Sequence, residues 1–282
     1  MIANMKLYRS IDGVILENEK VFKSIQIDTS WNDFIDREDL HSALMSAWKE
    51  GQVLHDGLDE NRLLAPIGSQ EIWAAGVTYH SSRLARMEES KDAGGGDFYS
   101  RVYGADRPEI FFKATPARTV GPGKEFRIRK DSTWDVPEPE LTLFVTSSGK
   151  IVGYTVGNDV SSRSIEGENP LYLPQAKTFD GCACLGPCLY VPEEPLSSKT
   201  KIEMTIERSG SEVFSDQTSL EQMKRSPEEL VSFLFRETSF PGGVFLMTGT
   251  GIVPGTDFTL MAEDKVSIEI ESIGTLINFV GH

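Results

Sequence analysis

Short apolar runs separated by Gly and Pro dominate the chain from about residue 65 onwards. Runs of this length and spacing are typical of short β-strands. They predict strands within EIFFKA (109–114), ELTLFVT (140–146), KIVGYTVGN (150–158), KIEMTIERSG (201–210), GVFLMTGTG (243–251) and KVSIEIESIG (265–274). There is no β-α-β rhythm and no G-x-G-x-x-G turn after a strand, which argues against a dinucleotide-binding fold.

Helical periodicity is confined to a few segments. Apolar residues recur at helical spacing between 37 and 51, where Gly51 predicts the end of a helix. A second helix is predicted to follow Ser226. Ser226 is a suitable N-cap, Pro227 suits the first helical position, and Glu229 completes a capping box.

These patterns predict an α+β fold that is mostly β. Residues 1–65 combine strand-like runs around Asp12-Gly13 with the predicted helix, so we expect a small N-terminal α/β domain there. Residues 66–282 hold the remaining strands, and we expect them to form the larger, main domain. A chain of 282 residues is long enough for this two-part organisation.

The charge of the chain narrows the range of its partners. Lys and Arg total 28 and Asp and Glu total 43, which gives a net charge of −15. Such a chain is repelled by phosphate backbones and anionic membranes, so neither is an expected partner. The N-terminus lacks the apolar run of a signal peptide and no stretch approaches the length of a membrane span, so we expect a cytoplasmic location.

The three cysteines, Cys182, Cys184 and Cys188, lie together in the segment GCACLGPC. An odd and clustered set is a poor disulfide framework. The spacing resembles a metal site, but no histidine is near in the sequence and small residues surround the thiols. Buried, reduced thiols are therefore the favoured interpretation, with a metal or redox role as the alternative.

Two acids stand at the start of the predicted strand 140–146. Glu138 and Glu140 are separated by one residue, and side chains at i and i+2 share one face of a strand, so both point the same way. Leu141 and Leu143 point to the other face and supply the burial. Packing alone does not explain why such a strand begins with two carboxylates.

The next strand brings a third acid to the same place. A two-residue turn at Ser148-Gly149 sets a register in which Asp159 falls opposite Glu138, and a shift of two residues leaves it beside Glu140. Three clustered carboxylates repel one another unless they are neutralised. Oxygen ligands alone favour Mg²⁺, with Mn²⁺ or Ca²⁺ as substitutes, over Zn²⁺. A solvated acidic edge without an ion is the alternative.

Several segments, in this order, resemble the fumarylacetoacetate hydrolase superfamily: WDVPEPELTLFV, GNDVSSRS, QAKTFDG and TGTG. In that family an E-x-E pair and the Asp of a G-N-D-V-S-x-R segment bind one divalent metal. A Lys in a K-x-x-D-G segment lies beside it, and a T-G-T loop holds the substrate. The resemblance covers roughly residues 65–282. It implies Glu138, Glu140 and Asp159 as ligands of Mg²⁺, Lys177 as the active-site lysine, a mixed β-roll catalytic domain and a homo-oligomer, either dimer or tetramer.

One segment departs from the hydrolases of this superfamily. Their N-Y-x-x-H-x-x-E segment carries a His-Glu dyad that activates water, whereas Ser82 and Ala85 stand at the dyad positions here. His80 lies two residues early and is better explained as an incidental loop residue than as a base. Together with GENPLYLPQAK and TGTGIVPG, the departure resembles the sugar-acid dehydratases of the family.

The function implied by this resemblance is Mg²⁺-dependent dehydration of a small 2-keto acid, 2-dehydro-3-deoxy-D-arabinonate, to 2,5-dioxopentanoate. The cation would stabilise the enolate that forms when a C3 proton leaves, and the enolate would then expel the C4 hydroxyl. The alternative is a hydrolase of acylpyruvates or diketo acids, or an oxaloacetate decarboxylase, of the same superfamily. A third class is a non-catalytic protein that holds a metal.

Several residues are candidates for proton transfer or substrate binding. Lys177 either transfers a proton, which requires a lowered pKa, or stays charged and binds the substrate. Glu109 is a second acid or base candidate, or else a strand-end acid at the surface. Ser82 and Arg83 lie where a substrate loop is expected, and Arg83 either forks onto the substrate or is a surface arginine. Thr250 in the T-G-T loop either binds the substrate carboxylate or only shapes the turn.

Overall fold

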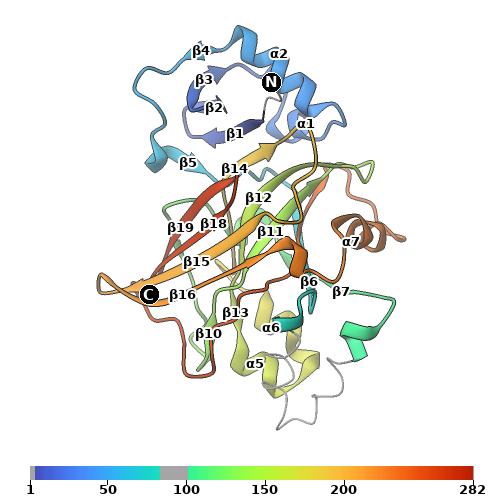
Figure 1. The fold of residues 1–282 in the computed structure, drawn as a ribbon, viewed down its shortest axis with the longest axis vertical. Coiled ribbons are helices and arrows are strands. Elements are labelled where there is room, and N and C mark those ends of the chain that lie inside the picture. Colours follow the sequence, from blue (N-terminus) through green and yellow to red (C-terminus); the bar gives the residue numbers. More distant parts are fainter. Residues whose placement is uncertain (1–3, 83–100, 282) are drawn as a thin grey trace.

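Most strands of the protein join one twelve-stranded sheet in the computed structural model, which describes residues 4–82 and 101–281 (Figure 1). Its order is β4-β3-β2-β1-β14-β12-β11-β17-β6-β7, with β5 paired to β1 and β8 paired to β14. The strands of this sheet are β1 (Met5–Ser10), β2 (Gly13–Asn18), β3 (Val21–Ile25), β4 (Gln52–Val53), β5 (Leu63–Leu64), β6 (Glu71–Gly76), β7 (Glu109–Ala114), β8 (Thr119–Val120), β11 (Pro139–Val145), β12 (Ile151–Asp159), β14 (Ala183–Val191) and β17 (Val244–Met247).

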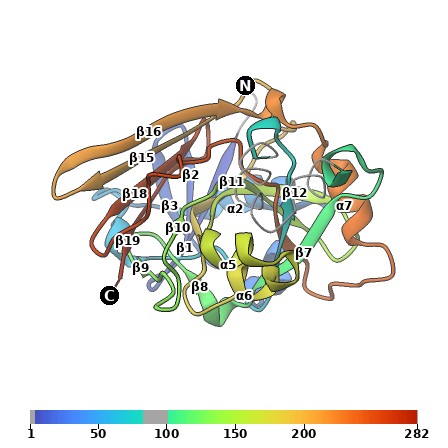
Figure 2. The same ribbon diagram turned by 90° about the horizontal axis from the view of Figure 1, so that it is seen from below.

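A second sheet has five strands in the order β16-β15-β18-β19-β9, and two short strands, β10 and β13, pair separately. Figure 2 shows the long hairpin of β15 and β16 along one side of the molecule. The strands are β9 (Glu125–Phe126), β10 (Asp135–Val136), β13 (Ser161–Ser162), β15 (Lys201–Arg208), β16 (Ser211–Ser219), β18 (Lys265–Ile270) and β19 (Gly274–Val280). The helices whose bounds lie wholly within the described residues are α1 (Trp31–Ile35), α2 (Leu40–Glu50), α5 (Arg163–Glu168), α6 (Leu173–Lys177) and α7 (Pro227–Leu234). The 3₁₀ turns of the described residues are η1 (Glu60–Arg62), η2 (Pro116–Arg118), η3 (Pro170–Tyr172) and η4 (Leu220–Gln222).

The N-terminal strands continue the large sheet. β1 pairs antiparallel with β14, with Met5 opposite Val191 and Leu7 opposite Leu189. These strands and helices α1 and α2 lie at one end of the molecule, and α5 and α6 lie at the other (Figure 1). A separate folding domain over residues 1–65 stays a prediction.

The core is packed on both faces of β11. Leu141 and Leu143 lie in one buried cluster with Met204 of the second sheet. Phe144 belongs to a second buried cluster on the other face, where its ring centroid is 5.0 Å from that of Phe245. Because β11 is buried on both faces, acids on this strand are cut off from bulk water.

The α+β, mostly β fold predicted from the sequence is confirmed, and a strand overlaps each predicted strand segment. The predicted helix ending at Gly51 is α2. The helix after Ser226 is α7, and the Ser226 hydroxyl accepts a hydrogen bond from the Glu229 N–H, as the capping box predicts. Among the described residues, no helix is both long and apolar enough to cross a bilayer.

Candidate metal centre

The hairpin of β11 and β12 sets the positions of the acids. Pro139 pairs with Asn158, and the Asp159 N–H donates to the Glu138 carbonyl over 3.0 Å. Asp159 therefore lies opposite Glu138, in the predicted register. Cross-strand neighbours on one face have Cβ atoms about 5 Å apart, so their carboxylates can meet.

The turn of this hairpin differs from the prediction. The Thr146 N–H donates to the Lys150 carbonyl over 2.9 Å, so the loop has three residues rather than the two expected at Ser148-Gly149. The ladder also shifts by one residue between Phe144 and Val145, which marks a β-bulge. The bulge offsets the longer loop, and the register at the acids is unchanged.

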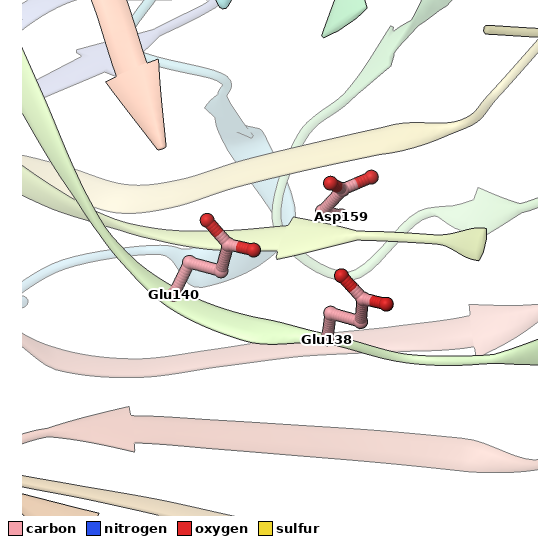
Figure 3. Close-up of side chains that lie close together, drawn as sticks. All are labelled: Glu138, Glu140 and Asp159. Carbon is pink, nitrogen blue, oxygen red and sulfur yellow. The ribbon is translucent and has the colours of Figure 1, made fainter. Parts of the chain in front are cut away.

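The carboxylates of Glu138, Glu140 and Asp159 point toward one another (Figure 3). One oxygen of each lies within 4.8 Å of the others. Their exposed fractions are 4%, 1% and 1%, which excludes a solvated acidic edge. They line a cavity of about 10 Å³, which is room for about one water or ion.

The surroundings of Glu140 destabilise the charged form of its carboxyl group. Burial, then the charges of Asp159 and Glu138, raise the pKa of Glu140 well above its usual range, and Lys177 opposes them only in part. One carboxylate oxygen, Oε2, accepts a hydrogen bond from the Gly249 N–H over 2.6 Å. The fold thus fixes the Glu140 carboxylate in place while leaving its charge under-compensated.

Lys177 lies at the end of α6 and reaches into the acidic cluster. Its Nζ donates to Glu138 Oε2 over 2.8 Å and to Ser161 Oγ over 2.6 Å, and it lies 3.4 Å from Asp159 Oδ2. Lys177 is fully buried and lines the same cavity. The structure therefore brings the predicted lysine and the three predicted acids into one site.

Two further buried cations were not predicted. Arg163 is 1% exposed, lines the cavity, and its Nη2 lies 2.7 Å from Glu138 Oε1. It is the arginine of the GNDVSSRS segment, so the motif already contained the signal. Lys113 of β7 is fully buried and lies 2.5 Å from Asp159 Oδ1. A lone lysine in an apolar strand gave no comparable signal.

The T-G-T loop packs against the turn that follows β6. A Cβ on Gly249 would lie 2.0 Å from Thr78 Oγ1, so only glycine fits there. Thr250 is 4% exposed and lines the cavity, but its hydroxyl accepts from the Ile252 N–H and donates to the Ile252 carbonyl. The hydroxyl of Thr250 is thus already used within its own loop.

The other predicted residues lie at different distances from the acids. Ser82 lines the cavity, and its hydroxyl donates to the Tyr79 carbonyl over 2.9 Å. Glu109 begins β7 opposite Gly76 of the cavity wall, where a Cβ on Gly76 would lie 2.5 Å from the Glu109 carboxyl group. His80 is exposed and packs edge-on against Tyr103. Arg83 and Ala85 lie outside the described residues.

The donor set of the site fits a hard divalent cation. Three carboxylates converge without a thiolate or imidazole, and hard cations such as Mg²⁺, Mn²⁺ and Ca²⁺ prefer oxygen ligands. A divalent charge would also relieve the repulsion that acts on Glu140. The three cysteines are buried free thiols, and the described residues give no metal-binding group that includes them.

A larger cavity of about 760 Å³ lies elsewhere, between β1, β2 and β19, and is lined by Lys6, Tyr8 and Glu17 among others. In the described parts of the chain, no group of three potential metal ligands lies in it. The chemistry of the side chains, rather than the size of the space, therefore identifies the small acidic cavity as the candidate centre.

Two dehydratases are similar to this chain over most of its length. It is 52% identical to the probable 2-keto-3-deoxyxylonate dehydratase of Haloferax volcanii over 233 residues, which cover 82% of this chain and 79% of the relative. It is 40% identical to the 2-dehydro-3-deoxy-D-arabinonate dehydratase of Saccharolobus solfataricus over 296 aligned positions, which cover 97% and 95% of the two chains.

A solved structure gives the same picture of the fold. The structure of 2-keto-3-deoxy-D-arabinonate dehydratase complexed with magnesium and 2,5-dioxopentanoate matches with a TM-score of 0.78 and 35% identity, over 99% of this chain and 98% of that chain. The model of the fumarylacetoacetate (FAA) hydrolase C-terminal domain matches residues 72–281. The chain therefore belongs to the fumarylacetoacetate hydrolase family.

Proposed function

We propose that this protein is a Mg²⁺-dependent dehydratase that converts 2-keto-3-deoxy-D-arabinonate to 2,5-dioxopentanoate and water. The buried acids Glu138, Glu140 and Asp159 beside Lys177 carry the proposal. Its support is the identity of 40% to a dehydratase named for this substrate, and the likeness to a dehydratase structure that holds magnesium and 2,5-dioxopentanoate.

The two similar dehydratases are named for different sugar acids, but these names describe one substrate in the D series. The 2-keto group removes the stereocentre at C2, and the 3-deoxy carbon removes the one at C3. Only C4 remains, and it has the same configuration in D-arabinonate and D-xylonate. The proposal therefore names one five-carbon acid rather than two.

The reaction removes one proton from C3 and hydroxide from C4, which leaves a double bond between C3 and C4. A proton then moves from C5 to C3, and the resulting C5 enol passes its hydroxyl proton to C4, so that C5 becomes an aldehyde. One molecule of water is lost. A bound Mg²⁺, held by the three acids, would polarise the keto group and lower the cost of removing the C3 proton. The chain itself must supply a base for carbon and an acid for the departing hydroxyl.

Lys177 is our first candidate for these proton transfers. Lys177 lines the cavity, and its Nζ is held by Glu138 and Ser161, so its position beside the three acids is fixed. In its charged form, Lys177 could instead bind the substrate carboxylate or the developing enolate. Glu109 is the second candidate, because its carboxyl group lies directly behind Gly76 of the cavity wall.

Substrate contacts are assigned to the rim of the same cavity. Ser82 and Thr250 line it, and we infer that they shape the substrate pocket mainly through position and backbone, since both hydroxyls already bond within their own loops. We keep Arg83 as a proposed partner of the substrate's oxygens. Arg163 is added as the residue that orients Glu138.

A hydrolase of the same family is less well supported. Water activation in those enzymes needs a base at the position of Ser82, and a serine hydroxyl bonded to the Tyr79 carbonyl is not a base at neutral pH. The two similar dehydratases and the serine at position 82 thus favour elimination of a hydroxyl over cleavage of a carbon–carbon bond. A homo-oligomeric assembly and a cytoplasmic location stay predictions.

The test is an assay of the purified protein on 2-keto-3-deoxy-D-arabinonate with Mg²⁺, coupled to a semialdehyde dehydrogenase and followed by NAD⁺ reduction. We expect a signal that EDTA abolishes and that excess Mg²⁺ restores. The same protein should not cleave an acylpyruvate. Cleavage of the acylpyruvate without turnover of the sugar acid would replace dehydration by hydrolysis as the function.

A further inference from the structure

We propose that Lys113 is a positioning residue for the reaction, which holds the metal ligand Asp159 and the backbone of Lys177 in one fixed arrangement. The inference rests on the proposed function, because it assigns Lys113 a role in that site. Lys113 does not line the cavity, so it acts through the two residues that do.

The contacts of the Lys113 ammonium group carry the argument. Its Nζ lies 2.5 Å from Asp159 Oδ1, donates to the Val160 carbonyl over 2.9 Å and donates to the Lys177 carbonyl. Two of the three N–H donors of the ammonium group are used by these carbonyls, and its positive charge pairs with Asp159 Oδ1. The group is completely buried, so water does not replace any of these partners.

A β-bulge places Lys113 at this point. Ile72 of β6 pairs with Ala114 of β7, and the next residue, Trp73, pairs with Phe112, so Lys113 has no partner opposite it. Bulges of this kind re-aim one side chain and are common beside active sites. At this bulged position the Lys113 side chain reaches β12 and the end of α6.

The contact with Lys177 fixes the end of α6. The last carbonyls of a helix lack partners within the helix, and Lys113 supplies one for the carbonyl of Lys177. The link is reciprocal, because the Thr178 hydroxyl donates back to the Lys113 carbonyl over 3.0 Å. The backbone that carries the Lys177 side chain is thus fixed by two hydrogen bonds, one donated by Lys113 and one accepted by it.

The contact with Asp159 assigns its two oxygens different roles. Oδ1 lies 2.5 Å from the Nζ of Lys113, whereas Oδ2 lies 3.4 Å from the Nζ of Lys177, which lines the cavity. Removal of Lys113 would free the Asp159 carboxylate to rotate and would leave a buried acid without its partner. Partners that orient metal ligands typically change metal affinity or activity by about 10- to 100-fold when they are lost.

The test compares Lys113→Met, which keeps an unbranched side chain, with Lys265→Met as the matched control. Lys265 is ion-paired to Glu207 over 3.1 Å in the second sheet, away from the acids. Calorimetric titration with Mg²⁺ and steady-state kinetics are the readouts. For K113M we expect Mg²⁺ affinity and kcat each to fall by about 10- to 100-fold, with KM changed by less than about threefold, and K265M to match the wild type.

The proposal is overturned if K113M binds Mg²⁺ as tightly as the wild type, or more tightly, and keeps its kcat. Tighter binding would mean that Lys113 contributes only a positive charge. Should K113M not fold, Thr178→Val removes the reciprocal hydrogen bond to the Lys113 carbonyl, together with the longer bond to the Phe112 carbonyl. It should lower kcat by about 3- to 10-fold without raising KM. Unchanged kcat in T178V would then contradict the proposal.

The Mg²⁺ titration needs no substrate, so it tests Lys113 even where the wild type fails to dehydrate the sugar acid.

Discussion

The Gly249 N–H donates a hydrogen bond to Oε2 of Glu140 over 2.6 Å, which ties the T-G-T loop to the central carboxylate of the site. Gly249 has a φ of +92°, and a Cβ there would lie 2.0 Å from Thr78 Oγ1 and 3.0 Å from the Ala75 carbonyl. The loop can therefore hold the Glu140 carboxylate only with glycine at this position.

We expect Gly249→Ala to move this loop and to weaken the site. The predicted loss of unfolding free energy is about 2–4 kcal/mol, with at least a tenfold loss of kcat, because the clash adds to the left-handed backbone cost. Gly210→Ala is the control, since Gly210 has a φ of +78° and no atom within 4 Å of a Cβ. It should lose about 1 kcal/mol in urea unfolding and keep full activity. Equal losses in both variants would contradict this account of the loop.

Replacing Glu140 by Gln should stabilise the metal-free protein while removing its response to Mg²⁺. The change removes one of three mutually repelling, buried charges, and the amide oxygen can still accept the hydrogen bond from Gly249. We expect the metal-free Tm to rise by about 2–4 °C, which corresponds to about 1 kcal/mol. Thermal scans with and without Mg²⁺ measure both effects, with exposed Glu125→Gln as the control. A Mg²⁺-dependent rise in Tm that survives in E140Q would contradict the three-carboxylate centre.

Two variants of Lys177 separate its two proposed roles. Lys177→Met should lower kcat by about 10²- to 10⁴-fold, because it removes either a proton-transfer group or a buried cation from the cavity. Lys177→Arg keeps a charge but cannot lose a proton at neutral pH. Partial activity with a raised KM in K177R would assign Lys177 to binding, and a kcat as low as that of K177M would assign it to proton transfer. Full activity of K177M would remove Lys177 from the mechanism.

Asp135 should make stability depend on pH near neutrality. Burial raises the pKa of Asp135 to about 6 from its ordinary value near 3.8, and hydrogen bonds from Ser132 and the Arg129 backbone oppose the shift. The protonated form is therefore favoured in the folded state. This contribution to stability is fully present below about pH 4 and is lost as the pH rises through about 6.

Asp135→Asn removes this titration, so its unfolding free energy relative to the wild type should increase by up to about 3 kcal/mol between about pH 4 and pH 7. Urea unfolding at a series of pH values measures the difference. Asp131→Asn is the control with the opposite sign, because hydrogen bonding to Arg129 lowers the pKa of exposed Asp131. A D135N curve parallel to that of the wild type would show that Asp135 does not titrate in this range.

The sequence predicts the acidic cluster well because the distances involved are short. Glu138 and Glu140 are two residues apart on a strand, and Asp159 follows one hairpin later, so strand periodicity and pairing fix their relation. The exact turn was missed because a bulge and a three-residue loop compensate each other, and sequence patterns do not reveal such a compensation. The register at the acids is nonetheless the one predicted.

Lys113 and its bulge could not be predicted in the same way. The lysine lies 46 residues before Asp159 in the chain, and the order of the strands in the sheet brings the two together. Arg163 differs, since it lies within the recognised GNDVSSRS segment, four residues after Asp159. Local motifs therefore predicted the three acids and Lys177 and contained Arg163, whereas the contact of Lys113 with Asp159 required the tertiary structure.

The most direct test of the central claim is to identify the product by ¹H NMR when the purified protein is mixed with 2-keto-3-deoxy-D-arabinonate and Mg²⁺. The account predicts conversion to 2,5-dioxopentanoate, seen as an aldehyde and its hydrate, which stops with EDTA and resumes with excess Mg²⁺. Pyruvate and glycolaldehyde as products, or conversion that continues in EDTA, would contradict a metal-dependent dehydratase at Glu138, Glu140 and Asp159.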